Sequence, residues 1–381
     1  MPKPWKKLDL LVAVLPAAVA AEVLSAPAPL VFVLGALAVV PLAGLIGRAT
    51  ESIAEKVGGS IGALLNATFG TFAELAIAAL LVLQGHIAIV KASVVGSLVG
   101  NLLLLLGVSI VLSSYDRAEI AFHRASRVQS TMLFLAVGIF LLPTLFSFRG
   151  EGTPARTDEL SDVIAAILIV LYALALLFML RTHRSLLRGS DGGESAPDGA
   201  ARDSTAEPGQ HRDGRPVPTG NPGEPSGRWS SRSAVLVLGA ATVLVTVAAE
   251  IVSGSIEEAG ASLGLTTGFL GFIVLPLVGN AAEQFSALAM AAKDRLDVAA
   301  DIAAGASIQL VMLVVPILVL VGVIGGHPFA LVFDELELAV LIVGTLLTRQ
   351  LVDDRKANWF EGVMLLGLYA AFAAAAFFVE V

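Results

Sequence analysis

The stretches Gly70-Thr71-Phe72-Ala73-Glu74 and Gly279-Asn280-Ala281-Ala282-Glu283 decide how the rest of the chain is interpreted. Both follow the pattern G-x-x-A-E, and each places a glutamate inside a long apolar run. An ionisable side chain near the middle of a bilayer costs about 2.5–3.5 kcal/mol on insertion scales, so it marks a functional site by default. The pair therefore indicates a membrane transporter with its site at the two glutamates.

The composition agrees with a membrane protein and excludes a soluble globular chain. Of the 381 residues, 56% are hydrophobic and only 15% are charged, against about 25% in soluble domains. Apolar windows long enough to span a bilayer recur along nearly the whole chain. Cysteine is absent, which excludes a disulfide framework and a thiolate metal site.

We expect an all-α polytopic fold with eleven transmembrane helices. The N-terminal Met1–Lys7 resembles the start of a signal peptide, but the many spans that follow favour a retained first helix. Loops on one side hold 21 of the 24 basic residues, which predicts a cytoplasmic N-terminus and an external C-terminus. The expected helices cover residues 8–24, 29–47, 60–83, 88–112, 129–148, 162–180, 234–252, 268–292, 297–323, 334–352 and 359–379.

A polar segment divides these helices into two groups. Residues from about 189 to 231 are rich in Gly, Pro, Ser, Asp and Arg, a composition that cannot bury enough surface to fold. The short sequences Val33-Leu34-Gly35-Ala36 and Val237-Leu238-Gly239-Ala240 match, and Ser52-Ile53 before the third helix matches Ser255-Ile256 before the eighth. Two units of five helices would lie inverted in the membrane, the plan of many secondary transporters. The expected divisions are a peripheral helix at 1–28, a first repeat at 29–182, a disordered cytoplasmic linker at 183–232 and a second repeat at 233–381.

Small and oxygen-bearing side chains recur at helical spacing around the two glutamates, so they share helix faces with them. Pro276 removes a backbone donor and should free a carbonyl near Phe272 as a further oxygen ligand. Ser97 and Asn101 have equivalents in Ser307 and Gln309. For all four side chains, hydrogen bonding between helices is the alternative to ion binding. Glu250 and Asp301, near helix ends, are candidates for an access path. The candidate cation ligands are Glu74, Glu283, Asn66, Gly70, Thr71, Ser97, Asn101, Gly279, Asn280, Ser307 and Gln309.

Charge balance at the two glutamates suggests a mechanism. We expect no Lys or Arg within any membrane core, so Glu74 and Glu283 have no internal counter-ion. Neighbouring carboxylates in low dielectric cannot both stay ionised and unpaired. One divalent cation or two protons would neutralise them, and competition between the two gives exchange. Oxygen-only ligands favour a hard ion such as Ca2+.

These motifs resemble the paired signature of the cation/proton exchangers, the bacterial, fungal and plant Ca2+/H+ antiporters. The resemblance rests on Asn66–Glu74, Leu275–Glu283, Gly96–Leu103, Gly305–Gln309 and Asn358–Gly362, and it covers essentially the whole membrane part. It implies a peripheral helix plus two inverted five-helix repeats. It also implies that both glutamates bind Ca2+ and protons alternately while the first, second, sixth and seventh helices shift against a core of helices 3–5 and 8–10.

The resemblance has two departures and leaves other functions open. Thr71 stands where the family usually has Asn, and Gln284 where a His often follows the second glutamate, which bears on the choice of ion. Alternatives are Na+ as coupling ion, transport of Mn2+, Na+ or K+, a passive cation channel, or an intramembrane hydrolase built on Ser60. We expect no enzyme activity, no cofactor and no nucleic-acid partner, only Ca2+, H+ and lipid, in a prokaryotic plasma membrane.

Overall fold

The computed structural model is mostly helical. It describes residues 13–57, 65, 68–115, 117, 119–121, 124–148, 153–178, 229–354 and 356–378. The expected linker lies almost entirely outside the described residues, as do Asn66 and Ser60.

Long apolar helices, several of them interrupted by short π-helical turns, make up the fold. In chain order the elements are α2 (Val14–Val23), α3 (Ala28–Val57), α5 (Phe72–Leu83), α6 (Ile87–Val99), η2 (Gly100–Leu105), α7 (Leu106–Ser114), β1 (Ile120–Ala121), α8 (Arg124–Phe140), α9 (Leu142–Phe148), α10 (Pro154–Leu177), α12 (Ser231–Leu263), α13 (Thr267–Phe269), η4 (Leu270–Val274), α14 (Leu275–Gly279), α15 (Ala281–Ala291), α16 (Leu296–Gln309), η5 (Leu310–Val314), α17 (Val315–Gly325), α18 (Glu335–Asp353), β2 (Lys356–Ala357) and α19 (Trp359–Phe378).

Among the described residues, seven helices are long and apolar enough to cross a membrane, or eight if the bent run from Thr267 to Ala291 counts as one span. This makes the chain an integral membrane protein. The shorter apolar helices α2 and α5 fall below the length of a full span. Helices overlap each of the expected ranges, but the number of eleven transmembrane spans stays a prediction.

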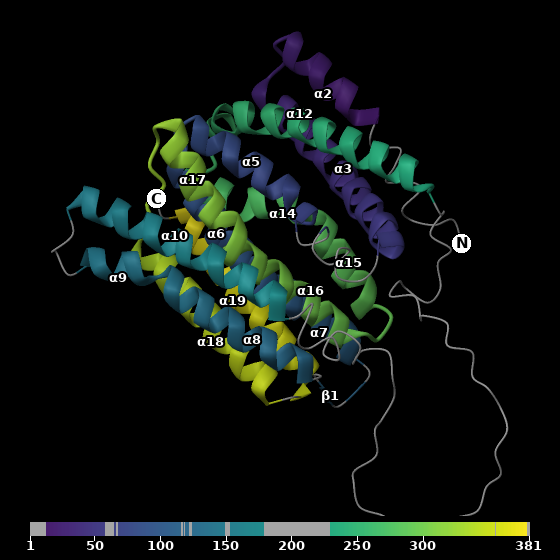
Figure 1. The fold of residues 1–381 in the computed structure, drawn as a ribbon, viewed down its shortest axis with the longest axis vertical. Helices are drawn as coiled ribbons and strands as arrows, with labels where there is room; N and C mark the ends of the chain where they lie inside the picture. Colours follow the sequence, from purple (N-terminus) through teal and green to yellow (C-terminus); the bar gives the residue numbers. More distant parts are fainter. Residues whose placement is uncertain are drawn as a thin grey trace, which may run out of the picture.

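The helices fall into two groups (Figure 1). Helices α3 and α12 lie side by side in the most extensive contact between any two elements, and α2 packs on α3. On the other side, α8, α10 and α16 to α19 form a second group, while α5, α14 and α15 lie between the two. The expected sixth helix is α10, and its contacts are with α8, α9, α17 and η5. It therefore packs within the second group, although we expected it to move with the helices of the first.

Two helices run further than their apolar stretches predict. Helix α3 continues to Val57 and α12 to Leu263. The expected helix ends at 47 and 252 are therefore too early, since Ser52-Ile53 and Ser255-Ile256 lie inside α3 and α12 and are buried there. Hydropathy marks the apolar part of a helix, but its hydrogen-bonded ladder continues through polar residues until a cap ends it. In α12 that cap is Gly264, with a φ of 67°.

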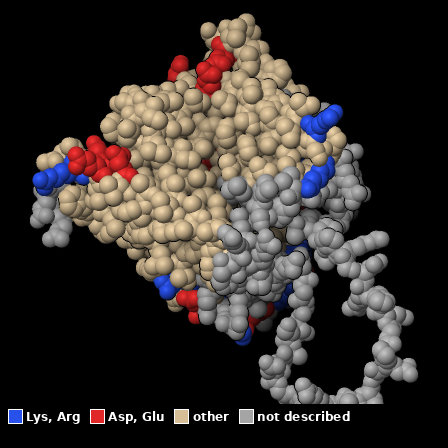
Figure 2. Space-filling model, in the orientation of Figure 1, with Lys and Arg blue, Asp and Glu red and all other residues tan. Residues whose placement is uncertain are grey.

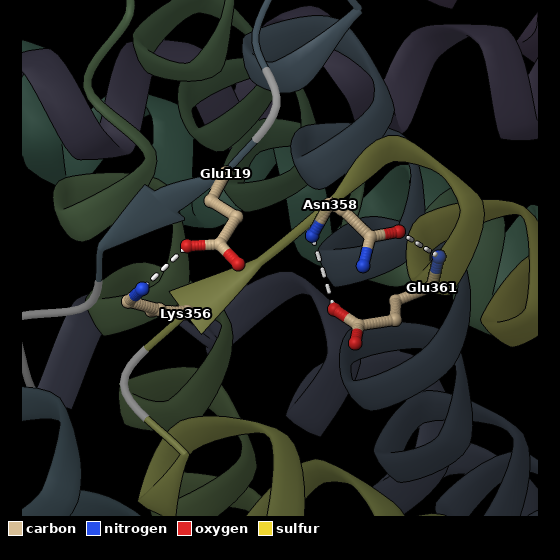
Figure 3. A network of polar contacts seen from close by, with 4 residues as sticks. All are labelled: Glu119, Lys356, Asn358 and Glu361. Atoms are coloured by element: carbon tan, nitrogen blue, oxygen red, sulfur yellow. Dashed lines mark hydrogen bonds and ion pairs between the residues drawn. The ribbon is translucent and has the colours of Figure 1, made fainter.

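Loops from distant parts of the chain are joined at one end of the molecule. Strand β1 pairs antiparallel with β2, and Lys356 Nζ donates to Glu119 Oε2 at 2.5 Å beside the pair (Figure 3). Asn358 and Glu361 exchange hydrogen bonds with each other's backbone N–H groups, a capping box that starts α19 (Figure 3). The match of Asn358–Gly362 to the family signature thus has a structural role.

Charged side chains gather near the rim of the face that Figure 2 shows. In Figure 2, Lys, Arg, Asp and Glu lie mostly near the rim of the visible face, and the broad centre is almost free of them. Large apolar side chains such as Leu236, Val243 and Ile324 are exposed on the surface of the molecule. An apolar band between polar ends is what a bilayer requires of a helical protein.

Candidate cation site at two broken helices

Each G-x-x-A-E stretch interrupts a helix just before its glutamate. Thr71 has φ −93° and ψ 14°, and Asn280 has φ −99° and ψ 13°, both outside the helical region. Helices α5 and α15 begin directly after these residues, so Glu74 and Glu283 both fall in a first helical turn. Between α14 and α15 the axis bends by 65°. The two sequence motifs therefore form the same local structure.

A helix beginning inside a membrane carries electrostatic consequences. The first N–H groups of α5 and α15 have no partner within their own helix, and the N-terminal end of each helix carries partial positive charge. Glu74 and Glu283 lie at these ends. Such breaks in mid-membrane helices are the usual places for ion and substrate sites in secondary transporters. The helix N-termini therefore favour negative charge on the two glutamates, which the apolar surroundings disfavour.

Glu74 is at the centre of a buried polar cluster with Ser97 and Asn280. Its side chain is only 6% exposed, and Ser97 and Asn280 are each 1% exposed. Ser97 Oγ donates to Glu74 Oε1, and Asn280 Nδ2 donates to the same oxygen at 3.2 Å. Asn280 Nδ2 also donates to Ser97 Oγ at 2.9 Å. Three predicted ligands, from both halves of the chain, thus meet at one point.

Gly279 lets the two halves approach each other closely. A Cβ atom placed on Gly279 would lie 3.2 Å from Glu74 Cβ and 3.3 Å from Glu74 Cα. Contacts that short are tighter than ordinary packing, so any larger residue would push α14 away from α5. We predicted Gly279 as a cation ligand. The structure gives it a packing role beside Glu74.

Glu283 is the second carboxylate of the site. Its side chain is half-buried, and it interacts electrostatically with Glu74. One turn along from Ser97, Asn101 is buried, and its Oδ1 has no hydrogen-bond partner in the described part of the chain. A buried amide oxygen without a partner is costly. It is therefore available as a ligand.

The remaining predicted ligands are less closely engaged. Ser307 Oγ donates to Ala303 O of its own helix at 2.8 Å, and Gln309 is half-buried at the end of α16. Thr71 is buried at the break before α5, with Gly70 beside it half-buried. Asn66 lies outside the described residues. Of the two access-path candidates, Glu250 on α12 is exposed and Asp301 on α16 is half-buried.

Close backbone contact between α6 and η4 fixes Ser97 relative to the second broken helix. A Cβ on Gly96 would lie 2.0 Å from the carbonyl oxygen of Phe272, and one on Gly271 would lie 2.5 Å from Ile89 O. The Phe272 carbonyl that we expected Pro276 to free thus packs against Gly96, one residue before Ser97. Sequence reasoning missed this role of Gly96, although small residues four apart are a known signal of close helix packing.

One lysine lies near the start of a membrane-spanning helix. Lys91 is half-buried on α6, inside the apolar run Ile87–Ser114. Its electrostatic partners are Glu337 and Asp158. The acids that Lys91 engages are therefore other than Glu74 and Glu283.

Fold and site together define a class of protein. It is a helical membrane transporter in which two broken helices each place a glutamate in a first helical turn. Residues 27–181 and 233–378 match the family described as sodium/calcium exchanger protein, and the chain belongs to that family. It is a transporter and not an enzyme, and the family indicates no cofactor.

Individual relatives share this fold over nearly their whole length. The chain is 38% identical over 351 residues to the Ca(2+)/H(+) antiporter of Synechocystis, covering 91% of each protein. It is 34% identical over 366 residues to the Ca(2+)/H(+) antiporter ChaA of Bacillus subtilis, covering 96% of each. The solved structure of native YfkE superposes with a TM-score of 0.77 at 30% identity, covering 98% of this chain and 99% of YfkE. The resemblance inferred from the motifs is therefore confirmed.

Proposed function

We propose that this chain exchanges cytoplasmic Ca2+ for external H+ by alternating access, with Glu74 and Glu283 shared by the two ions. The observation that carries the proposal is the buried contact of Glu74 with Ser97 and Asn280. The names of the relatives, Ca(2+)/H(+) antiporters from two bacteria, support Ca2+ and H+ as the transported ions.

The chemistry of the donors suits a hard cation. Carboxylate, amide and hydroxyl oxygens are the ligands that Ca2+ takes. Among the described residues, no group of three or more His, Cys, Asp or Glu gathers into a metal site, so the two glutamates supply the full negative charge. Ca2+ bound between them neutralises both, and protons do the same when Ca2+ leaves. Ion exchange at one site follows from that competition.

Movement of α3 and α12 against the remaining helices gives the alternating access. These two helices pack on each other more extensively than on anything else, which suits a unit that moves together. Helix α5 contacts α12, and α14 and α15 contact α3, so the broken helices form the interface across which this unit slides. Helix α10 stays with the core in this proposal. We further propose that the halves before and after the linker are inverted repeats. The similar φ and ψ angles of Thr71 and Asn280 support this.

The test of the ion pair is 45Ca2+ uptake into proteoliposomes that hold the purified chain. We expect uptake when a pH gradient, acid inside, is imposed, and little uptake under a Na+ gradient of equal size. Uptake driven by Na+ alone would replace the proton by sodium as coupling ion. Flux that runs without either gradient and without counter-transport would indicate a passive channel.

A further inference from the structure

A pair of polar contacts joins α12 to the loop between α5 and α6. His86 Nδ1 lies 2.6 Å from Glu257 Oε1, and Gln84 Nε2 donates to Ser253 Oγ at 3.2 Å. Ser253 and Glu257 are one turn apart on α12, so both contacts lie on the same face of that helix. The unit formed by α3 and α12 is thus tied to the core at the end of α5 opposite to Glu74.

The loop that carries His86 has little freedom to move away. Gly85 has a φ of 84°, which side-chain-bearing residues rarely adopt. A Cβ there would lie 3.3 Å from His327 Cε1, so the turn is pressed against the loop that follows α17. His86 itself is the residue before α6, the helix that carries Ser97. A change at the Glu257 contact therefore concerns the position of α12 and not that of a mobile loop.

Helix α12 is packed most closely at this same end. Most residues between Ala248 and Gly260 are buried, whereas Leu236, Val243 and Leu244 in the other half of the helix are exposed. The two contacts thus close the end of α12 that reaches Glu257. By the orientation that the basic residues predict, this is the external end, and the inference rests on that orientation.

We infer that His86 and Glu257 form a pH-sensitive latch that holds α12 against the core at the external face. While His86 carries a proton, its contact with Glu257 is an ion pair with charge attraction. Once that proton is lost at higher external pH, a weaker neutral contact remains. The ratio of closed to open α12 then falls by about two- to fivefold, the size expected for a partly exposed pair.

Few other charges face this histidine in the described part of the chain. Glu257 comes from α12, with Glu258 exposed beside it and Glu250 two turns earlier. From the loop after α17 comes His327, which touches the turn at Gly85. Helix α6 contributes Lys91, one turn beyond its start, engaged with Glu337 and Asp158. Among the described residues at this end, His86 and Glu257 are in direct contact as base and acid.

The absence of cysteine makes the latch directly measurable. Spin labels on Ala155→Cys of α10 and Ser262→Cys of α12, both exposed, report the distance between core and α12 by double electron–electron resonance. In Ca2+-free nanodiscs we expect the longer-distance population to grow about two- to fivefold between pH 5.5 and 8. A label pair at Ala155→Cys and Ile324→Cys, both on the core, should not change.

Three variants decide whether His86 is the cause. His86→Gln should give the long-distance population at both pH values, and His86→Lys, which stays charged, should keep the short one at both. Glu258→Gln removes the neighbouring acid and should respond to pH like the unmodified chain. A pH response that survives in His86→Gln, or one absent from the unmodified chain, would overturn the latch. Because no Ca2+ flux is involved, a failure of Ca2+/H+ exchange would leave this result readable.

Discussion

Both hydrogen bonds to Glu74 reach the same oxygen, Oε1, and they come from different helices. Ser97 approaches from α6 and Asn280 from the break before α15. A carboxylate held this way keeps a fixed direction, and an ion at its other oxygen meets a prepared ligand. Asn280 therefore couples the position of the second broken helix to the carboxylate of the first.

Replacing Ser97 by Ala should weaken Ca2+ binding by roughly tenfold or more, because a buried hydrogen bond to a charged group contributes about 1.5–3 kcal/mol. Calorimetric titration of Ca2+ into purified protein measures this. The matched control is Ser307→Ala, whose hydroxyl donates to its own helix at 2.8 Å. Equal losses of Ca2+ affinity in both variants would contradict a special role of the hydrogen bond from Ser97 to Glu74.

The residue types at the site were predictable, and their pairings were not. Glu74, Ser97 and Asn280 stand out because each is polar inside an apolar run. Ser97 donates to Glu74, whereas Ser307 donates to Ala303. These partners depend on helix rotation and side-chain rotamers, which the spacing of residues does not determine. The same holds for Gly279, whose contact with Glu74 appears only when both halves are assembled.

Interruptions of regular helix are what define the elements of this protein. The breaks at Thr71 and Asn280 and the π-helical turns η2, η4 and η5 lie in the helices that carry the candidate ligands. Such turns occur often at functional sites, because they free backbone carbonyls. In η2, the carbonyl of Leu102 accepts from Thr348 Oγ1 at 3.3 Å, which joins it to α18.

At this scale Gly96→Ala should be severely destabilising. A methyl group there would overlap the Phe272 carbonyl oxygen, so α6 and η4 would have to separate at a cost of about 1–3 kcal/mol or more. Thermal unfolding followed by tryptophan fluorescence in detergent measures the effect. Gly100→Ala on the same helix face, with nothing within 4 Å of its Cβ, should unfold near the unmodified temperature. If Gly96→Ala is as stable as Gly100→Ala, the close contact is not required.

Sequence reasoning placed the helices and missed their breaks. Pro276 predicted a freed carbonyl near Phe272, but the axis bends four residues after Pro276, at Asn280. Neither Thr71 nor Asn280 is a helix breaker by itself. Asn280 contacts Glu74 and Ser97, and Thr71 lies three residues before Glu74, which makes the same contacts. Local propensity does not contain such tertiary contacts.

For the whole molecule, charge and contact agree on which loops share a side. Arg117 pairs with Asp294 at 2.8 Å and Lys356 with Glu119 at 2.5 Å, joining three loops that the basic residues assign to the cytoplasm. The opposite end carries His86 and Glu257. That these loops share a side was thus open to prediction from Lys and Arg, whereas the grouping of α10 with the core required the packed structure. The orientation in the membrane stays a prediction.

This orientation predicts a labelling pattern in intact cells. A membrane-impermeant maleimide should react with Ser262→Cys from outside, whereas Lys293→Cys should react only after the cells are permeabilised. Both substitutions are at exposed positions in a chain without cysteine, so the background is clean. The reverse labelling pattern would show that the protein has the opposite orientation in the membrane, and the proposed direction of Ca2+ movement would then be reversed.

The central claim is that Glu74 and Glu283 bind either Ca2+ or protons. Proton release on Ca2+ binding tests it most directly, measured with a pH indicator on purified protein in weak buffer at a pH where Ca2+ still competes with protons. The account predicts release of up to two protons per Ca2+ bound, since Ca2+ replaces the protons that neutralise the two carboxylates. Glu74→Gln and Glu283→Gln should each reduce both the release and the binding. Full Ca2+ binding with no proton released would contradict the shared site.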